Sequence, residues 1–142
     1  MAVAVIDTNV LLDFRDEASI RHEQAQEIVS AMDHGELPTG RVTNYVVLET
    51  LNWLHERHRH DFAVDTFNRL SSSSGFEIVQ SAQKDFHRAV ELFEQYEGLS
   101  FGDATIAAYM HREEIEYLYS FDGDFDAVDE ITRLTTASNP SR

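Results

Sequence analysis

Four acidic residues stand at the borders of apolar segments, where a folded chain rarely leaves a carboxylate. They end or interrupt runs such as residues 2–6 and 104–108, and they are Asp7, Glu49, Asp103 and Asp122. Removing an ionised carboxylate from water is costly unless a partner balances its charge. The four acids therefore indicate a shared counter-ion, and oxygen ligands of this kind suit a hard divalent cation such as Mg²⁺ or Mn²⁺.

Each of these acids also has an ordinary structural explanation. Asp7 could cap the helix that follows it, and Asp103 could complement the dipole of its own helix. Glu49 could lie on the solvent face of a helix, and Asp122 could serve a turn. The metal-site interpretation therefore depends on all four acids occurring in order and in matching surroundings.

The elements that must position these acids alternate along the chain. Strand patterns cover residues 3–6, 76–79, 117–120 and, weakly, 132–135; helical patterns cover residues 20–32, 45–57, 61–70, 82–96 and 103–111. This alternation predicts an α/β fold, a three-layer α/β/α sandwich with a mostly parallel central sheet. Ligands of such sheets bind beyond the carboxyl ends of the strands. Asp7 and Asp122 should therefore share one rim of the sheet, with Asp103 at or near a helix start.

The charge balance of the chain is unusual. It has 26 acidic residues against 11 Lys plus Arg, a formal net charge of −15, and a single lysine, Lys84. Such a composition is typical of proteins adapted to high salt, where the surface charge is screened; an ordinary acidic protein is the alternative. The acidity weighs against a nucleic-acid partner, because phosphate contacts need Lys and Arg. That objection weakens in concentrated salt.

Length and composition set further bounds. The 142 residues predict a single domain over residues 1–136, followed by a disordered tail over residues 137–142. The absence of cysteine excludes disulfides and thiolate metal sites. No apolar run approaches the roughly 20 residues needed to span a membrane, and the first residues do not form a secretory signal. A cytoplasmic protein is the expectation.

Four stretches carry a family resemblance: residues 4–13, 46–49, 99–108 and 120–125. In that combination the chain resembles the PIN-domain ribonucleases, and among them the VapC-type toxins of toxin–antitoxin pairs. The resemblance runs from the first strand to the acidic turn. It implies that the catalytic, metal-binding acids are Asp7, Glu49, Asp103 and Asp122, and that the supporting polar residues are Asn9 and Ser120.

The last acid of the set is open to an alternative. Acids occupy every second position at Asp122, Asp124 and Asp126. The family pattern favours Asp122, with Asp124 as a supporting residue or as the alternative ligand, and Asp126 could belong to a short helix. Ser120 stands where the family often has Thr, which keeps the hydroxyl group.

Basic residues offer weaker signals. Arg15 follows the first acidic motif closely, and we expect it near the site as an RNA contact. The histidines of residues 55–60 are interpreted as a solvated helix end, with RNA contact or a metal site as alternatives.

The resemblance implies a Mg²⁺- or Mn²⁺-dependent endoribonuclease that hydrolyses RNA phosphodiester bonds. It further implies a toxin with a VapB-like antitoxin as partner and a homodimer. The lack of a long apolar run separately predicts no membrane association. One alternative is a housekeeping PIN nuclease in RNA maturation, which the lack of room for an accessory RNA-binding module disfavours. The other is a non-catalytic PIN scaffold, which has no need of all four acids.

Overall fold

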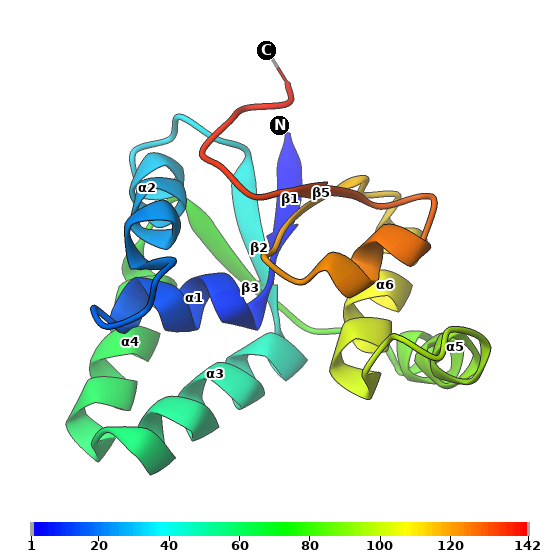
Figure 1. The fold of residues 1–142 in the computed structure, drawn as a ribbon, viewed down its shortest axis with the longest axis horizontal. Helices are drawn as coiled ribbons and strands as arrows, with labels where there is room; N and C mark the ends of the chain where they lie inside the picture. Colours follow the sequence, from blue (N-terminus) through cyan, green and yellow to red (C-terminus); the bar gives the residue numbers. More distant parts are fainter. Residues whose placement is uncertain (1, 142) are drawn as a thin grey trace.

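A five-stranded sheet forms the centre of the protein, and helices cover both of its faces (Figure 1). The computed structural model describes residues 2–141. The strands lie in the order β3-β2-β1-β4-β5 and every described pairing is parallel; they are β1 (Val3–Ile6), β2 (Thr39–Thr43), β3 (Phe76–Val79), β4 (Tyr117–Tyr119) and β5 (Thr132–Leu134). The predicted three-layer α/β/α fold is confirmed.

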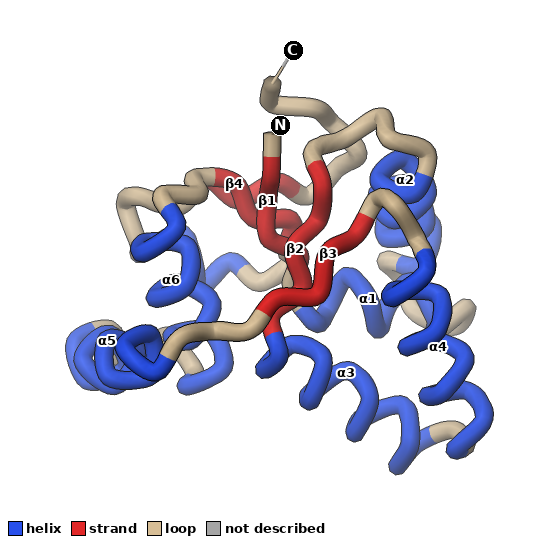
Figure 2. The backbone as a smooth tube through the Cα atoms, turned by 180° about the vertical axis from the view of Figure 1, so that it is seen from behind, coloured by secondary structure: helices blue, strands red, loops and turns tan. Residues whose placement is uncertain are grey.

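Six α-helices and one short 3₁₀ helix complete the described fold: α1 (Thr8–Arg15), α2 (His22–Asp33), α3 (Asn44–Arg57), α4 (His60–Ser72), α5 (Gln83–Gln95), α6 (Phe101–Glu113) and η1 (Gly123–Ala127). Helices α1, α2 and α4 lie on one side of the sheet, and α5 and α6 lie on the other (Figure 1). Helix α3 runs outward from the carboxyl end of β2 towards α4 (Figure 2). Within residues 2–141, no helix combines the length and apolarity that crossing a bilayer requires.

Two of these elements, β2 and α1, lie outside the predicted segments. The β2 sequence contains Thr39, Gly40 and Arg41, which by composition alone favour a turn. It becomes a strand because β1 and β3 pair with it on both sides. A β-carbon at Gly40 would lie 2.6 Å from the sulfur of Met32, so any other residue there would force the Met32 side chain of α2 to move.

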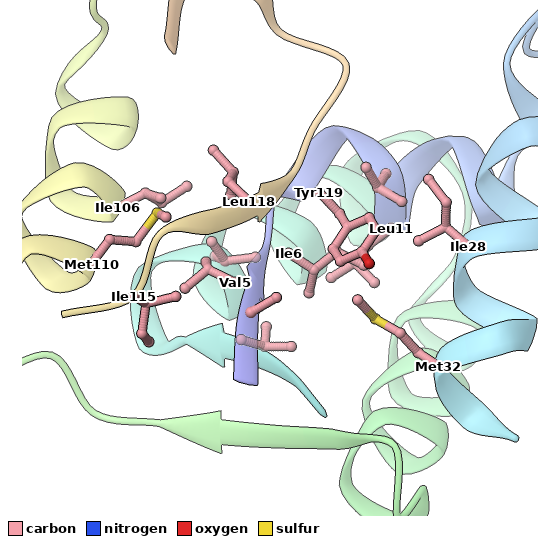
Figure 3. Packing of buried hydrophobic residues seen from close by; sticks show 14 of the residues in the cluster. Val5, Ile6, Leu11, Ile28, Met32, Ile106, Met110, Ile115, Leu118 and Tyr119 are labelled. Atoms are coloured by element: carbon pink, nitrogen blue, oxygen red, sulfur yellow. The ribbon is translucent and has the colours of Figure 1, made fainter. Parts of the chain in front are cut away.

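The core extends over both faces of the central strands. Side chains alternate along β1, so that Val5 points to the α6 side and Ile6 points towards α1 and α2 (Figure 3). Tyr119 and Leu118 of β4 repeat this alternation, and all four residues are fully buried. Because β1 and β4 are buried on both faces of the sheet, their sequences are apolar at nearly every position.

The register of β1 against β4 brings the residues just beyond the two strands together. Ile6 pairs with Tyr119, and the Asp7 amide donates a 3.0 Å hydrogen bond to the Tyr119 carbonyl. Asp7 and Ser120 are therefore neighbours at the rim of the sheet. The strand order also reverses direction at β1 and β4, and parallel sheets open a crevice at such a switch point.

The segment after β5 returns across the sheet. The Tyr119 hydroxyl donates to the Ser138 carbonyl at 2.7 Å, and the side-chain amide of Asn139 donates to the Glu36 carbonyl at 2.9 Å. The disorder of residues 137–142 stays a prediction. Arg142, within that tail, and Met1, within the predicted domain, lie outside the described residues.

Candidate active site

Asp7 occupies the junction between β1 and α1, with a single residue linking the two elements. It is the N-cap of α1, and one carboxylate oxygen accepts a 2.7 Å hydrogen bond from the Thr8 amide. The other oxygen accepts from Asn9 at 3.1 Å and from the Ser120 hydroxyl at 2.7 Å. Only 5% of Asp7 is exposed. The strand, the helix and two polar side chains thus fix this carboxylate in position.

Asn9 and Ser120 connect Asp7 to the acidic turn. The Asn9 side-chain oxygen accepts a 3.1 Å hydrogen bond from the Phe121 amide, and the Ser120 oxygen accepts a 3.0 Å bond from the Asp122 amide. Ser120 is fully buried. The two residues therefore hold the end of β4 against the start of α1, as the supporting role expected of them requires.

Asp103 is the third residue of α6 and completes a capping box with Ser100. The Asp103 amide donates to the Ser100 hydroxyl at 3.1 Å, and the Asp103 carboxylate accepts from the Ser100 amide at 3.3 Å. The Asp122 carboxylate caps η1 by accepting from the Asp124 amide at 2.9 Å. Ligand oxygens of Asp103, Asp122 and Asp124 all lie within 4.8 Å of one another, close enough to share a cation.

Glu49, an exposed residue, reaches the same region from α3. Its carboxylate lies against Gly102 of α6, where a β-carbon would sit 2.6 Å from the Glu49 Oε1 atom. Glycine at position 102 thus lets the Glu49 carboxylate rest directly on the first turn of α6, next to Asp103 in sequence.

Burial and repulsion between the carboxylates dominate the electrostatics of the site. Burial raises the pKa of Asp7 to about 6, and the nearby charges of Asp122 and Glu49 add to this rise. Burial, followed by the charges of Asp122 and Asp7, raises the pKa of Asp103 to about 7. Burial also raises the pKa of Glu49. An all-oxygen donor set in which the acids repel one another fits a hard divalent cation, whose charge would reverse these shifts.

The structure does not bring Arg15 to these acids. Arg15 ends α1, eight residues and roughly 12 Å of helix away from Asp7. Its guanidinium binds Asp65 at 3.0 Å and lies 4.0 Å from the centre of the Phe62 ring. Arg15 therefore ties α1 to α4, and an RNA contact at this residue stays a prediction.

Arg133 is a residue of the site that the sequence did not indicate. From β5 it donates to the Ser120 carbonyl at 3.2 Å and binds both carboxylate oxygens of Asp126, at 2.9 and 3.0 Å. This contact explains why Asp126 does not join Asp122 and Asp124, despite the alternation of the three acids. The sequence signal that could have indicated this residue is the position of an arginine in the middle of the last predicted strand.

The acids of four separate elements thus meet at one edge of a parallel sheet, and a model of the PIN domain matches residues 4–131. The chain belongs to the PIN-domain family. Its solved relatives include the Mycobacterium tuberculosis toxin VapC20, described as cleaving the sarcin–ricin loop. That structure is 25% identical, has a TM-score of 0.76, and is matched over 90% of this chain and 95% of its own. The predicted PIN-domain family is thereby confirmed.

Other solved structures share the fold at lower identity. A toxin–antitoxin complex from Klebsiella pneumoniae is 24% identical, with a TM-score of 0.67 and coverage of 91% of this chain and 95% of that one. VapBC2 from Rickettsia felis, bound to a DNA fragment of its promoter, is 13% identical, with a TM-score of 0.71. The match covers 96% of this chain and 98% of that one. No curated protein matches the chain significantly.

The contact between Gly102 and Glu49 gives a prediction for the PIN domain. Gly102→Ala should displace the Glu49 carboxylate by roughly the overlap of the new methyl group, without unfolding α6, since alanine favours a helix. We expect metal-dependent activity to fall about tenfold while the melting temperature stays the same or rises. Glu49→Gln should lower the activity by a similar factor. Adding Gly102→Ala to the Glu49→Gln variant should then lower the activity little further. Additive losses would contradict the contact.

Proposed function

We propose that this PIN domain is a Mg²⁺- or Mn²⁺-dependent endoribonuclease and the toxin of a VapBC-type pair. The observation that carries the proposal is the convergence of Asp7, Glu49, Asp103 and Asp122 at the rim formed by β1, β4 and α6. Its membership of the PIN family and the similarity to VapC20 support the ribonuclease activity. A scaffold that only binds proteins has no reason to keep four carboxylates whose repulsion destabilises the fold.

Each acidic residue of the proposed site has its own role. Asp103 and Asp122 would hold the cation, with Asp124 close enough to replace or join Asp122. Asp7 would complete the site in the orientation that Asn9 and Ser120 impose. A bound Mg²⁺ or Mn²⁺ supplies Lewis-acid activation of water and neutralises charge at the phosphate. Glu49, which reaches the site from α3, would orient the attacking water or a second cation.

The toxin assignment rests on the kinds of structure that the chain resembles. Its neighbours include complexes of a toxin with an antitoxin from Klebsiella pneumoniae and Rickettsia felis. We propose a VapB-like antitoxin as the partner of this chain. A short gene for a DNA-binding protein directly beside the gene of this chain would support the toxin role over a housekeeping role in RNA maturation. An isolated gene would favour the housekeeping alternative.

We also propose a homodimer. Three phenylalanines, Phe86 and Phe93 of α5 and Phe101 of α6, pack edge to face with ring centres 5.5 and 5.7 Å apart. Phe86 and Phe93 are 43% and 47% exposed, a large aromatic surface to leave in water, and a second copy would cover it. Sedimentation equilibrium of the protein beside a Phe86→Ser/Phe93→Ser variant tests this; a monomeric parent would rule the dimer out.

The activity itself is tested by incubating labelled RNA with the protein in Mg²⁺, in Mn²⁺ or in EDTA. We expect cleavage at internal positions in either metal and none in EDTA. The assay should be run at low salt and in molar KCl, because a net charge of −15 repels RNA unless the charge is screened. Equal cleavage in EDTA would contradict the metal-dependent mechanism, and a substrate cut only from its ends would contradict endonuclease activity.

A further inference from the structure

An RNA-binding surface on so acidic a protein needs cations that carboxylates have not already neutralised. Most arginine side chains of this chain are paired with acids within 4.0 Å: Arg15, Arg41, Arg57, Arg69, Arg88, Arg112 and Arg133. Over residues 2–141, the arginine and lysine side chains outside such pairs are Arg21, Arg59 and Lys84. Among the described residues, these three are the arginine and lysine side chains whose charge no carboxylate within 4.0 Å offsets, so a phosphate contact is sought first among them.

Of the three, Arg21 lies beside the acidic turn. Its guanidinium donates a 3.1 Å hydrogen bond to the carbonyl of Phe121 and lies 5.2 Å from the centre of the Phe121 ring. Phe121 directly precedes Asp122, so a positive charge borders the turn that carries Asp122 and Asp124. Arg59, by contrast, precedes α4, and Lys84 lies in the first turn of α5.

The backbone of Arg21 is held in place from α1. The Arg21 amide donates to the Ser19 hydroxyl oxygen at 3.1 Å, and that hydroxyl donates to the Asp13 carboxylate at 3.0 Å. The His22 amide also donates to the Ser19 carbonyl at 3.1 Å. Asp13 belongs to the same helix that Asp7 caps, so these hydrogen bonds connect Arg21, the N-cap residue of α2, to the helix that begins at the site.

The side chain is oriented and still has hydrogen-bonding capacity. A guanidinium carries five N–H donors, and the bond to Phe121 uses one of them. Arg21 is exposed, and the aromatic ring restricts its rotation without neutralising its charge. A planar, oriented guanidinium of this kind matches two oxygens of a phosphate group.

We propose that Arg21 binds a backbone phosphate of the RNA substrate, one that neighbours the phosphate cleaved at the acids, with Phe121 holding the guanidinium in its binding orientation. This inference rests on the proposed ribonuclease function and names a substrate contact for it. Arg21 binds the substrate in the ground state and the transition state alike, so its loss raises KM more than it lowers kcat.

The test compares Arg21→Gln and Arg21→Lys with Arg59→Gln, which removes the same charge from an exposed, unpaired arginine at the start of α4. Cleavage of a pool of labelled single-stranded and stem-loop RNA oligonucleotides in Mn²⁺ gives KM, kcat and the Mn²⁺ concentration for half-maximal activity. Fluorescence anisotropy at several KCl concentrations gives the salt dependence of RNA binding.

We expect Arg21→Gln to raise KM about tenfold, as for one lost charge-assisted contact, with kcat and the Mn²⁺ requirement nearly unchanged. The magnitude of the slope of log affinity against log salt should fall by about 0.7, because this is the contribution of one phosphate contact on a single strand. Arg21→Lys should recover the salt slope but only part of the affinity, because it lacks the planar fork. Arg59→Gln should match the parent.

Two results would overturn the inference. One is equal KM values for Arg21→Gln and Arg59→Gln. The other is an effect confined to the Mn²⁺ requirement, which would mean that Arg21 acts only on the acids. In both cases the parent still cleaves RNA and the proposed function stands. A parent that neither cleaves nor binds RNA in Mn²⁺ refutes the proposed function and this inference together.

Discussion

Asp103→Asn is expected to lower metal-dependent RNA cleavage by about a thousandfold, roughly 4 kcal/mol of transition-state stabilisation, while the protein stays folded. Asp103 contributes one of the three closely spaced carboxylates, and asparagine has no charge with which to hold the cation. The capping box should survive, because an asparagine oxygen can still accept from the Ser100 amide. Without metal, the variant should melt no lower than the parent, since a repelled charge has been removed.

Asp85→Asn is the matched control for this prediction. Asp85 is also a buried acid in the third position of its helix, where its carboxylate accepts from the Ala82 amide. Arg112 binds it at 2.6 and 3.0 Å, and the hydrogen bonds from Arg112 lead the effects that hold the pKa of Asp85 below its usual value, against the effect of burial. Asp85→Asn should therefore destabilise the fold and keep metal-dependent cleavage. Loss of activity in both variants without unfolding would contradict the assignment of the site.

The metal-free protein should lose stability as pH rises from about 4 to about 7. The pKa of Asp7 is raised to about 6 and that of Asp103 to about 7, from an ordinary value of 3.8. An acid with a raised pKa in the folded state stabilises the fold fully below its unfolded pKa, and this stability is lost as pH rises through the folded pKa. Each pKa unit corresponds to about 1.4 kcal/mol, so the combined loss is on the order of a few kcal/mol.

A divalent cation should reverse this loss above pH 7. At one hundred times its dissociation constant, Mn²⁺ adds about 2.7 kcal/mol to the free energy of unfolding. Urea denaturation at pH 4.5 and 7.5, in EDTA and in Mn²⁺, measures both effects. The Asp7→Asn/Asp103→Asn variant separates them from the general repulsion of an acidic protein, because it should lose the Mn²⁺ response and part of the pH slope. An identical pH dependence in parent and variant would refute the prediction.

Asp85 contributes with the opposite sign and in a different range. Its pKa is lowered in the folded state, so its contribution is fully present above the ordinary value of 3.8 and is lost as pH falls from there through the lowered pKa. The two effects therefore leave the metal-free protein most stable in mildly acidic solution, with its acid limit set by the pair of Asp85 and Arg112.

The sequence predicted those parts of the fold that local patterns specify. β1 and β4 were predictable because each is a short apolar run. β1 has the predicted bounds, and β4 ends one residue earlier than predicted. The family pattern then named acids that the register of β1 and β4 brings to one rim. β2 escaped prediction because its Thr-Gly-Arg sequence becomes a strand only through pairing on both sides.

Side-chain partners at the site could not be read from sequence spacing. Arg15 is close to Asp7 along the chain, yet eight residues of helix carry it to Asp65. Arg21 is farther along the chain and returns to Phe121, 100 residues away. The contact of Gly102 with Glu49 likewise joins two helices whose angle no local pattern specifies.

The origin of the four acids in two halves of the chain has a consequence during protein synthesis. Asp7 and Glu49 belong to the part made first, whereas Asp103 and Asp122 arrive with α6 and the turn after β4. The hydrogen bond from Ser120 to Asp7 spans 113 residues, and such distant parallel pairings form late because a long loop must close first. A ribosome that makes this chain is therefore not exposed to the proposed nuclease until β4 has emerged and docked beside β1.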